Sequence, residues 1–400
     1  MNLMRPRKES KILLLTIQYP PVIGGVPTYY HYLTTRWDKG SMVVLTSMVP
    51  DSREPDAGLG FPVYRTDLMN DYEVVFNLRF IFRKIRLFIF ITKIVFKEKI
   101  DIIIEGHTNL ALLFLCFLMK MLFGKRYGNV YHGDVDSPSI RLKSDPLKRI
   151  LMHHCCFVIT NSAFAQDRLM RKFSYPRERI SILHPGVDSD KFKPSGDGVE
   201  ELRKKLGLEG KKIIMTISRL EKRKGQDMVV RSLPEIVAAD KDVVYLLIGD
   251  GPYKSEVETI IQETKMQAYV RSFGYVRANE LTLYYNLCDI FIMPNRELED
   301  GDAEGFGIVF IEAGSCGKPV VAGRCNGALD AVEDGISGML VDPYDPRDIA
   351  AKVSLLLKDD ELRARLGENG RKRILERFQW DSNIKHFKDR FPAFLSGDLC

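Results

Sequence analysis

One pattern recurs along this chain and constrains its fold more than any other feature: a short apolar run rich in β-branched residues, a turn, and then a helical stretch. Such runs are typical of strands buried on both faces, and strands that alternate with helices pair in parallel. In the first half the runs are Lys11–Ile17, Met42–Thr46, Asp101–Glu105, Asn129–His132 and Cys156–Thr160. In the second half they are Lys212–Ser218, Val243–Gly249, Val270–Phe273, Asp289–Met293, Pro319–Ala322 and Met339–Val341. Two series in 400 residues predict an α/β protein with two doubly wound, Rossmann-like domains.

The boundary between the two series is predicted near residues 184–210. The segment His184–Asp188 has turn chemistry, and the polar segment 194–198 is rich in residues that break regular structure. We therefore expect a first domain over residues 1–188 and a second over 189–377. The last segment, 378–400, contains several aromatic residues and is expected to pack against one of these domains.

Several functional classes are excluded by motifs that the sequence lacks. The seven cysteines form no C-x-x-C pair, and the histidines show no H-E-x-x-H spacing, which disfavours zinc sites and a disulfide scaffold. No G-x-G-x-x-G or P-loop motif occurs, which disfavours a dinucleotide-dependent dehydrogenase and a P-loop nucleotidase. The longest apolar stretch, Leu110–Met119, is followed by Lys120, so no membrane-spanning helix is expected.

Positive charge is concentrated in the first half of the chain. Residues 1–200 hold 29 lysines and arginines against 20 acids, whereas residues 201–400 hold 30 against 33. An excess of this kind indicates an anionic partner such as nucleic acid, phospholipid or a phosphorylated substrate. No nucleic-acid-binding module accompanies the charge, so nucleic acid is not expected.

Part of this excess lies in a stretch of cations and large apolar residues, Arg79–Lys99. Its cations recur at helical intervals and are expected to line one helix face: Arg79, Arg83, Arg86, Lys93 and Lys97. This composition is typical of a helix that lies on an anionic membrane surface. The alternative is an ordinary crossover helix whose apolar face packs on the sheet.

Two features of the first half are candidates for a ligand site. The first strand runs into Gly24 and Gly25, and a glycine turn that opens a helix presents backbone N–H groups to an anion. His132 ends a later strand and is followed by a glycine, which places it to meet a ligand. A plain tight turn and a buried structural histidine are the alternatives.

Two further features follow strands of the second half. Arg219 and Lys224 lie in the loop after its first strand, where both could neutralise a pyrophosphate. Glu304 and Glu312 flank a glycine loop and an apolar helix start, so Glu304 is expected in the loop and Glu312 about two turns along the helix. Glu201/Glu209 and Glu368/Glu376 share this spacing, so the glycine context carries the prediction.

The order of several motifs resembles that of the retaining E-x7-E glycosyltransferases, which have two Rossmann-like domains facing across a cleft (the GT-B fold). The resemblance covers roughly residues 10–380. It rests on Tyr19–Gly25, Asn161-Ser162, His184–Asp188 with Phe192 and Pro194, Ser218–Leu220 with Lys224-Gly225, Leu247–Pro252, Pro294, and Glu304–Gly307 through Glu312-Ala313. Bacterial members that transfer a hexose, often mannose, to a lipid-linked or glycan acceptor are the most similar.

The resemblance implies a role for each matching residue. Arg219 and Lys224 would hold the donor pyrophosphate, with Gly24 and Gly25 closing over it from the first domain. Glu312 would bind the ribose, Glu304 the hexose, and the backbone near Val276 the base. His132 would lie beside the reacting carbon and Asp134 would contact the acceptor. Backbone amides near the phosphates would come from Phe306, Gly307, Ile308 and Val309.

The resemblance also implies how the protein works as a whole. The donor would be a GDP- or UDP-hexose, transfer would need no metal or other cofactor, and the C-terminal helix would return to the first domain. Together with the basic stretch, it predicts a cytoplasmic enzyme of cell-surface polysaccharide or glycolipid synthesis, peripheral on the inner face of the membrane.

Three other functions remain compatible with these residues. A metal-dependent D-x-D glycosyltransferase is one, although four such triplets occur in the chain and none stands out. A sugar-nucleotide epimerase on the same fold would bind the nucleotide but transfer nothing to an acceptor. A non-catalytic binding protein could also retain the fold.

Overall fold

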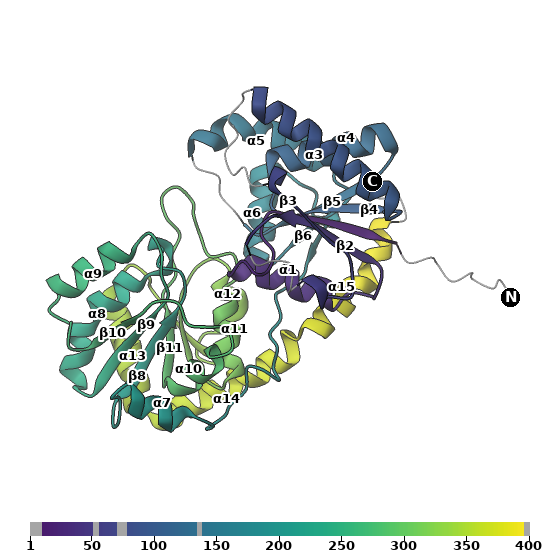
Figure 1. Ribbon diagram of the computed structural model, residues 1–400. Coiled ribbons are helices and arrows are strands. Elements are labelled where there is room, and N and C mark those ends of the chain that lie inside the picture. The colour runs from purple at the N-terminus through teal and green to yellow at the C-terminus, as the bar shows by residue number, and fades with distance from the viewer. Residues whose placement is uncertain (1–9, 51–55, 70–77, 134–137, 396–400) are drawn as a thin grey trace. The chain divides into compact units, whose positions relative to one another are not determined.

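A computed structural model of the protein describes residues 10–50, 56–69, 78–133 and 138–395 (Figure 1). The chain divides into two compact units. Unit 1 comprises residues up to His184 together with those from Ile384 onward, and unit 2 comprises Pro185–Asn383. From the sequence we expected the chain to pass from the first domain to the second after residue 188 and to return at residue 378. Both positions lie within a few residues of the boundaries in the structure.

Unit 1 is built on a seven-stranded parallel sheet. Its order is β3-β2-β1-β4-β5-β6-β7, and central Leu14 pairs with Val44 on one side and Ile104 on the other. The strands are β1 (Ile12–Thr16), β2 (Met42–Ser47), β3 (Val63–Thr66), β4 (Ile102–Glu105), β5 (Arg126–Tyr131), β6 (Val158–Thr160) and β7 (Ile180–Ile182). The five runs predicted in this half all form strands, whereas β3 and β7 were not predicted.

Helices flank this sheet and enclose one apolar core. The core takes residues from β1, β2, β4 and β5 and from helices α3 to α6. Asn109 begins α4 by accepting hydrogen bonds from the amides of Ala111 and Leu112, at 3.0 and 3.2 Å. The helices are α1 (Gly25–Thr35), α3 (Leu78–Lys97), α4 (Leu110–Phe123), α5 (Pro138–His153), α6 (Ala163–Phe173) and α15 (Trp380–Leu395), with 3₁₀ turns η1 (Asp67–Met69) and η2 (Arg177–Arg179).

Unit 2 has a six-stranded parallel sheet of order β10-β9-β8-β11-β12-β13. All six runs predicted in the second half form its strands. These are β8 (Lys212–Ile217), β9 (Val243–Ile248), β10 (Val270–Phe273), β11 (Ile290–Met293), β12 (Val320–Gly323) and β13 (Gly338–Val341). Both faces of the sheet are buried, because Ile213 and Met215 belong to one core while Ile214 between them belongs to another.

The helices of unit 2 cover these two faces. Side chains of α8, α9 and α13 fill one core, and those of α7, α10, α11 and α12 fill the other. The helices are α7 (Val199–Lys205), α8 (Gln226–Ala239), α9 (Lys254–Glu263), α10 (Leu281–Leu287), α11 (Ile308–Ser315), α12 (Ala328–Ala331), α13 (Pro346–Lys358) and α14 (Asp360–Arg377), with the 3₁₀ turn η3 (Lys222–Lys224). The two sheets confirm the predicted pair of Rossmann-like domains.

Each sheet has a topological switch point, where the strand order reverses and ligands bind beyond the carboxyl ends of the strands. In unit 1 it lies between β1 and β4, and in unit 2 between β8 and β11. The loops that follow β8 and β11 carry the predicted site residues Arg219, Lys224 and Glu304. The topology of unit 2 therefore brings these three residues to one edge of its sheet.

The last helix, α15, begins in unit 2 and ends in unit 1. In unit 1 its Phe387 ring lies 6.1 Å from that of Trp37, and Lys388 forms an ion pair of 2.8 Å with Asp38. The part of α15 from Ile384 onward thus packs within unit 1.

Candidate active site

The loop that follows β8 carries the cations of the site. Arg219 is 67% exposed along its side chain, and one of its guanidinium nitrogens lies 3.2 Å from Glu221. Lys224 ends the 3₁₀ turn η3, and Gly225, with φ +75°, directly precedes α8. A Cβ on Gly225 would lie 2.1 Å from the carbonyl oxygen of Pro294, so only glycine lets this loop pack against the loop after β11.

Glu304 joins the two loops through a cluster of ion pairs. Its Oε2 accepts a hydrogen bond from the Lys224 ammonium and another, 2.9 Å long, from the Arg223 guanidinium. All three side chains are mostly buried. Burial alone would raise the pKa of Glu304, but the charges of Lys224 and Arg223 hold this pKa below its usual value. The structure thus brings Glu304 and Lys224 into contact.

Arg223 is the residue of this cluster that the sequence did not indicate. Besides Glu304 it contacts Glu221, at 2.6 Å, and Asp302, at 3.2 Å. Burial raises the pKa of Asp302, and the charge of Arg223 opposes that rise. Arg223 therefore cross-links the loops that follow β8 and β11.

A second ion pair fixes the same two loops from below the surface. Arg296 in the loop after β11 donates two hydrogen bonds, of 3.0 and 2.8 Å, to Asp227 in the first turn of α8. Both side chains are more than nine-tenths buried. The amide of Arg296 also donates to the carbonyl of Arg223, at 2.8 Å. This pair positions the backbone from which Arg223 and Lys224 extend.

Glu312 lies on α11, and its carboxylate accepts a 2.7 Å hydrogen bond from the Tyr285 hydroxyl. Burial raises the pKa of Glu312, while the Tyr285 hydrogen bond and the charge of Lys191 oppose the rise. Glu312 is only about one turn into the helix, not two, because Gly307 has φ +87° and α11 begins after it at Ile308.

The segment between Glu304 and Glu312 also contains the residues whose backbone amides are expected near the donor phosphates. The Phe306 ring is buried against Phe378, 5.5 Å away, and Ile308 and Val309 pack on the same core. The first N–H groups of α11 have no partner within the helix, as at any helix start. A phosphate could accept hydrogen bonds from them.

His132 directly follows β5 in unit 1 and is only 6% exposed. Its Nε2 lies 2.8 Å from the Tyr30 hydroxyl, which donates to the carbonyl of Gly106, so Nε2 carries the proton that His132 donates. Its Nδ1 then accepts a hydrogen bond from the side-chain amide of Asn161, at 3.4 Å. Burial lowers the pKa of His132 to about 4, so the ring is neutral at pH 7.

The remaining predicted residues lie near other strand ends. Gly24 precedes and Gly25 begins α1, whose Thr28 amide donates to the carbonyl of Gly24 at 3.1 Å. Val276 follows β10 and is buried. Asp134 lies outside the residues that the structure describes.

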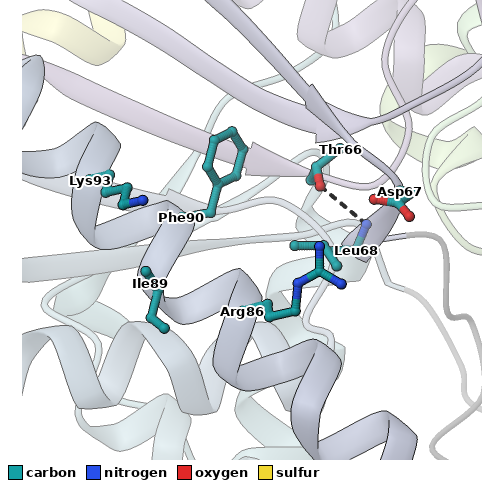
Figure 2. Close-up of a pocket in the computed structure, with 7 residues that line it drawn as sticks. All are labelled: Thr66, Asp67, Leu68, Arg86, Ile89, Phe90 and Lys93. Atoms are coloured by element: carbon teal, nitrogen blue, oxygen red, sulfur yellow. Dashed lines mark hydrogen bonds between the residues drawn. The ribbon is translucent and has the colours of Figure 1, made fainter.

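The predicted basic helix forms over α3, with Arg79, Arg83, Arg86, Lys93 and Lys97 spaced along it. A hollow of about 290 Å³ lies between this helix and the segment Thr66–Leu68. Figure 2 shows the side chains that line it. Arg86 and Lys93 line it from α3, with Asp67 among the residues opposite. Arg83 is turned toward η1, where it donates a 2.5 Å hydrogen bond to the carbonyl of Asp67.

Two kinds of feature are absent from the described ranges. Within them, no three His, Cys, Asp or Glu side chains cluster closely enough to hold a metal ion. No helix in the described part of the chain combines the length and apolarity that crossing a membrane requires.

Two family models together match most of the chain. Residues 198–373 match the model of the glycosyl transferases group 1, and residues 23–191 match that of glycosyltransferase family 4. HepE of Anabaena, solved with UDP and glucose, superposes with a TM-score of 0.80 at 20% identity, covering 96% of this chain and all of that one. The chain belongs to the group 1 glycosyltransferases of the GT-B fold.

Two relatives share one name: GDP-mannose-dependent α-(1-6)-phosphatidylinositol monomannoside mannosyltransferase. That of Mycolicibacterium smegmatis is 37% identical over 220 residues, which are 55% of this chain and 57% of the relative. That of Mycobacterium tuberculosis is 28% identical over 399 residues, covering 97% of this chain and 99% of the relative. This kinship favours a transferase over an epimerase or a non-catalytic binding protein.

Proposed function

We propose that the protein is a retaining mannosyltransferase that uses GDP-mannose and extends a phosphatidylinositol mannoside or a closely related glycolipid. The observation that carries this proposal is the full-length similarity to mannosyltransferases with that donor and that class of acceptor. The Lys224–Glu304–Arg223 cluster at the switch point of unit 2 supports it, because a sugar donor carries a pyrophosphate next to its hexose.

In this proposal the loops of unit 2 hold the donor. Arg219 and Lys224 bind the pyrophosphate, and the first amides of α11 add hydrogen bonds to it. Glu312 binds the ribose, Glu304 the hexose, and the backbone at Val276 the base. In the structure Glu304 neutralises Lys224. The bound phosphates then compete for this ammonium, which leaves a carboxylate oxygen of Glu304 to accept from a sugar hydroxyl.

The cations serve the chemistry as well as binding. As the glycosidic bond breaks, negative charge builds up on the leaving phosphate, and Arg219 and Lys224 stabilise charge that exists only in the transition state. His132 is neutral and its Nε2–H is donated to Tyr30, so beside the hexose it acts as an uncharged group and not as a cation. Gly24 and Gly25 in unit 1, together with Asp134, complete the proposed contacts with donor and acceptor.

Replacing Lys224 or Glu312 by alanine tests these assignments. Each change should abolish transfer of labelled mannose to phosphatidylinositol monomannoside and weaken GDP binding, measured as a smaller GDP-dependent rise in melting temperature. Lys222→Ala is the matched control, because Lys222 lies in the same 3₁₀ turn but is exposed. Near-normal kinetics in Lys224→Ala, or stabilisation by UDP and not by GDP, would contradict the proposal.

We also propose that unit 1 docks on the inner, anionic face of the membrane through α3. Only four of its twenty residues are buried: Leu87, Ile91, Ile94 and Val95. Large apolar side chains on the rest of the helix face solvent, including Leu78 and Phe82, which are 73% and 63% exposed. An ordinary crossover helix would bury these side chains, whereas an interfacial helix inserts them between lipids.

Charge reversal on α3 tests this docking. Each cation near an anionic leaflet contributes about 1 kcal/mol, so Arg83→Glu, Arg86→Glu and Lys93→Glu together should weaken binding to phosphatidylglycerol vesicles by about 3 kcal/mol or more, on the order of a hundredfold. The matched control reverses three exposed lysines of unit 2: Lys204, Lys205 and Lys241. Equal vesicle binding by the two triple variants would rule out α3 as the docking helix.

A further inference from the structure

An apolar groove runs between α3, α4 and α5 on the surface of unit 1. Its volume is about 360 Å³, within the range of ligand pockets. Ten of its eleven lining residues are apolar, and Lys84 is the eleventh. Ile81, Ile85 and Phe114 line it and are each between 44% and 50% exposed. A hollow lined almost wholly by hydrocarbon side chains suits an apolar ligand.

We propose that this groove holds one fatty-acyl chain of an anionic phospholipid from the membrane. The inference rests on the proposed docking of α3 and adds a lipid-binding site to it. A hydrocarbon chain needs no hydrogen-bond partner, and the lining offers only the ammonium of Lys84. That ammonium lies 3.4 Å from the carbonyl of Leu68 and 5.0 Å from the centre of the Phe80 ring.

A bound peptide fits this groove less well than a lipid chain. Every peptide unit carries an N–H and a C=O group that must find partners when buried. The side chains that line the groove, apart from Lys84, are hydrocarbon and supply none. A peptide would therefore lose hydrogen bonds with water and gain no replacements.

The charge around the groove selects an anionic headgroup. Helices α3 and α4 together carry seven lysines and arginines and no carboxylate. A phosphate group at the mouth of the groove would be attracted by these cations. A second copy of the chain is disfavoured, because a two-fold contact across this groove would place the Lys84 ammonium of one copy near that of the other.

Monomeric lipid provides a direct test. The probe is lysophosphatidylglycerol with bromine on its acyl chain, used below its critical micelle concentration, and the reporter is Phe114→Trp in the groove. We expect quenching of this tryptophan, whereas Phe96→Trp, which is on α3 but outside the groove, should not be quenched. Two variants should weaken binding of the lipid at least tenfold: Ala111→Phe, which fills the groove, and Ile85→Lys, which places a charge in it.

The possible failures are distinguishable. Vesicle binding with no quenching by the monomeric lipid, or equal affinity for glycerophosphoglycerol, which has no chain, would overturn the groove assignment alone. Absence of vesicle binding by the unmodified protein would refute the membrane docking on which it rests. A dimer in sedimentation that Ile85→Lys dissociates would assign the groove to a second copy. Urea unfolding followed by Trp37 fluorescence in a Trp380→Phe background should be unchanged in both groove variants, which shows that unit 1 folds.

Discussion

The buried His132 should make the stability of unit 1 fall in acid. Its pKa is about 4 in the folded protein and about 6.5 in an unfolded chain. Because the folded pKa is depressed, the unfolded state binds the proton first, so this contribution is present above pH 6.5 and is lost as the pH falls toward 4. Between pH 7.5 and 4.5 the loss is about 2.5 kcal/mol at about 1.36 kcal/mol per pH unit.

The measurement needs a probe that reports on unit 1. The chain has two tryptophans, Trp37 in unit 1 and Trp380 in unit 2. In a Trp380→Phe background, urea unfolding followed by fluorescence therefore reports on Trp37. We expect the free energy of unfolding to fall by about 2.5 kcal/mol more in this protein than in its His132→Gln derivative when the pH changes from 7.5 to 4.5.

Comparing the two proteins cancels the titration of all other groups that the substitution leaves unchanged. Gln keeps a donor and an acceptor at this position but takes up no proton. Parallel pH profiles for the two proteins would refute the assignment of a buried, neutral imidazole. They would also remove the argument that His132 is uncharged beside the sugar.

Three further substitutions test contacts that stabilise the two units. Asp227→Asn should destabilise unit 2 by about 3 to 5 kcal/mol in urea unfolding, because Arg296 is left buried without its counter-charge; a change below 1 kcal/mol would argue against this. Gly225→Ala should cost about 2 kcal/mol or more and weaken GDP binding, since its Cβ would meet the carbonyl of Pro294; an unchanged melting temperature would refute the clash. Burial raises the pKa of Glu105 to about 7. Its contribution to the free energy of unfolding is therefore full below pH 4.5 and is lost as the pH rises through 7. Glu105→Gln should therefore reduce the fall in stability between pH 5 and 8 by about 2.5 kcal/mol, and identical denaturation profiles would contradict this.

Most of the fold could be predicted because the strands that are buried on both faces have continuous apolar sequences. The two strands that escaped prediction lie at the edges of the unit 1 sheet. β3 is Val-Tyr-Arg-Thr and mostly half-buried, and β7 has three residues after a 3₁₀ turn. Short edge strands of this kind are defined by pairing with a neighbour, which local sequence does not record.

The candidate site was partly predictable for a similar reason. Arg219, Lys224 and Glu304 stand out because glycines and strand ends surround them in sequence. Arg223 does not, since within its basic loop only the geometry of the 3₁₀ turn distinguishes it from Lys222. The partners Asp227 and Arg296 are 69 residues apart, so only the packing of two loops reveals the pair.

Which side of α3 faces solvent could also not be predicted from the sequence. Its cations could be assigned to one stripe from their spacing, but apolar residues occur around much of the rest of the helix. Such a helix can turn either side toward the sheet, and the choice depends on the neighbouring elements. In the structure Leu87 and Ile91 are buried, whereas Phe82 and Ile89 are exposed.

The path of α15 has a consequence for the order in which the protein forms during synthesis. Phe387 and Lys388 complete the surroundings of Trp37, but they leave the ribosome only after the whole of unit 2. Unit 2 is therefore complete in sequence before the last segment of unit 1 is synthesised. Unit 1, although begun first, is finished last, and a ribosome that stops short of Ile384 releases a chain whose first domain lacks its final helix.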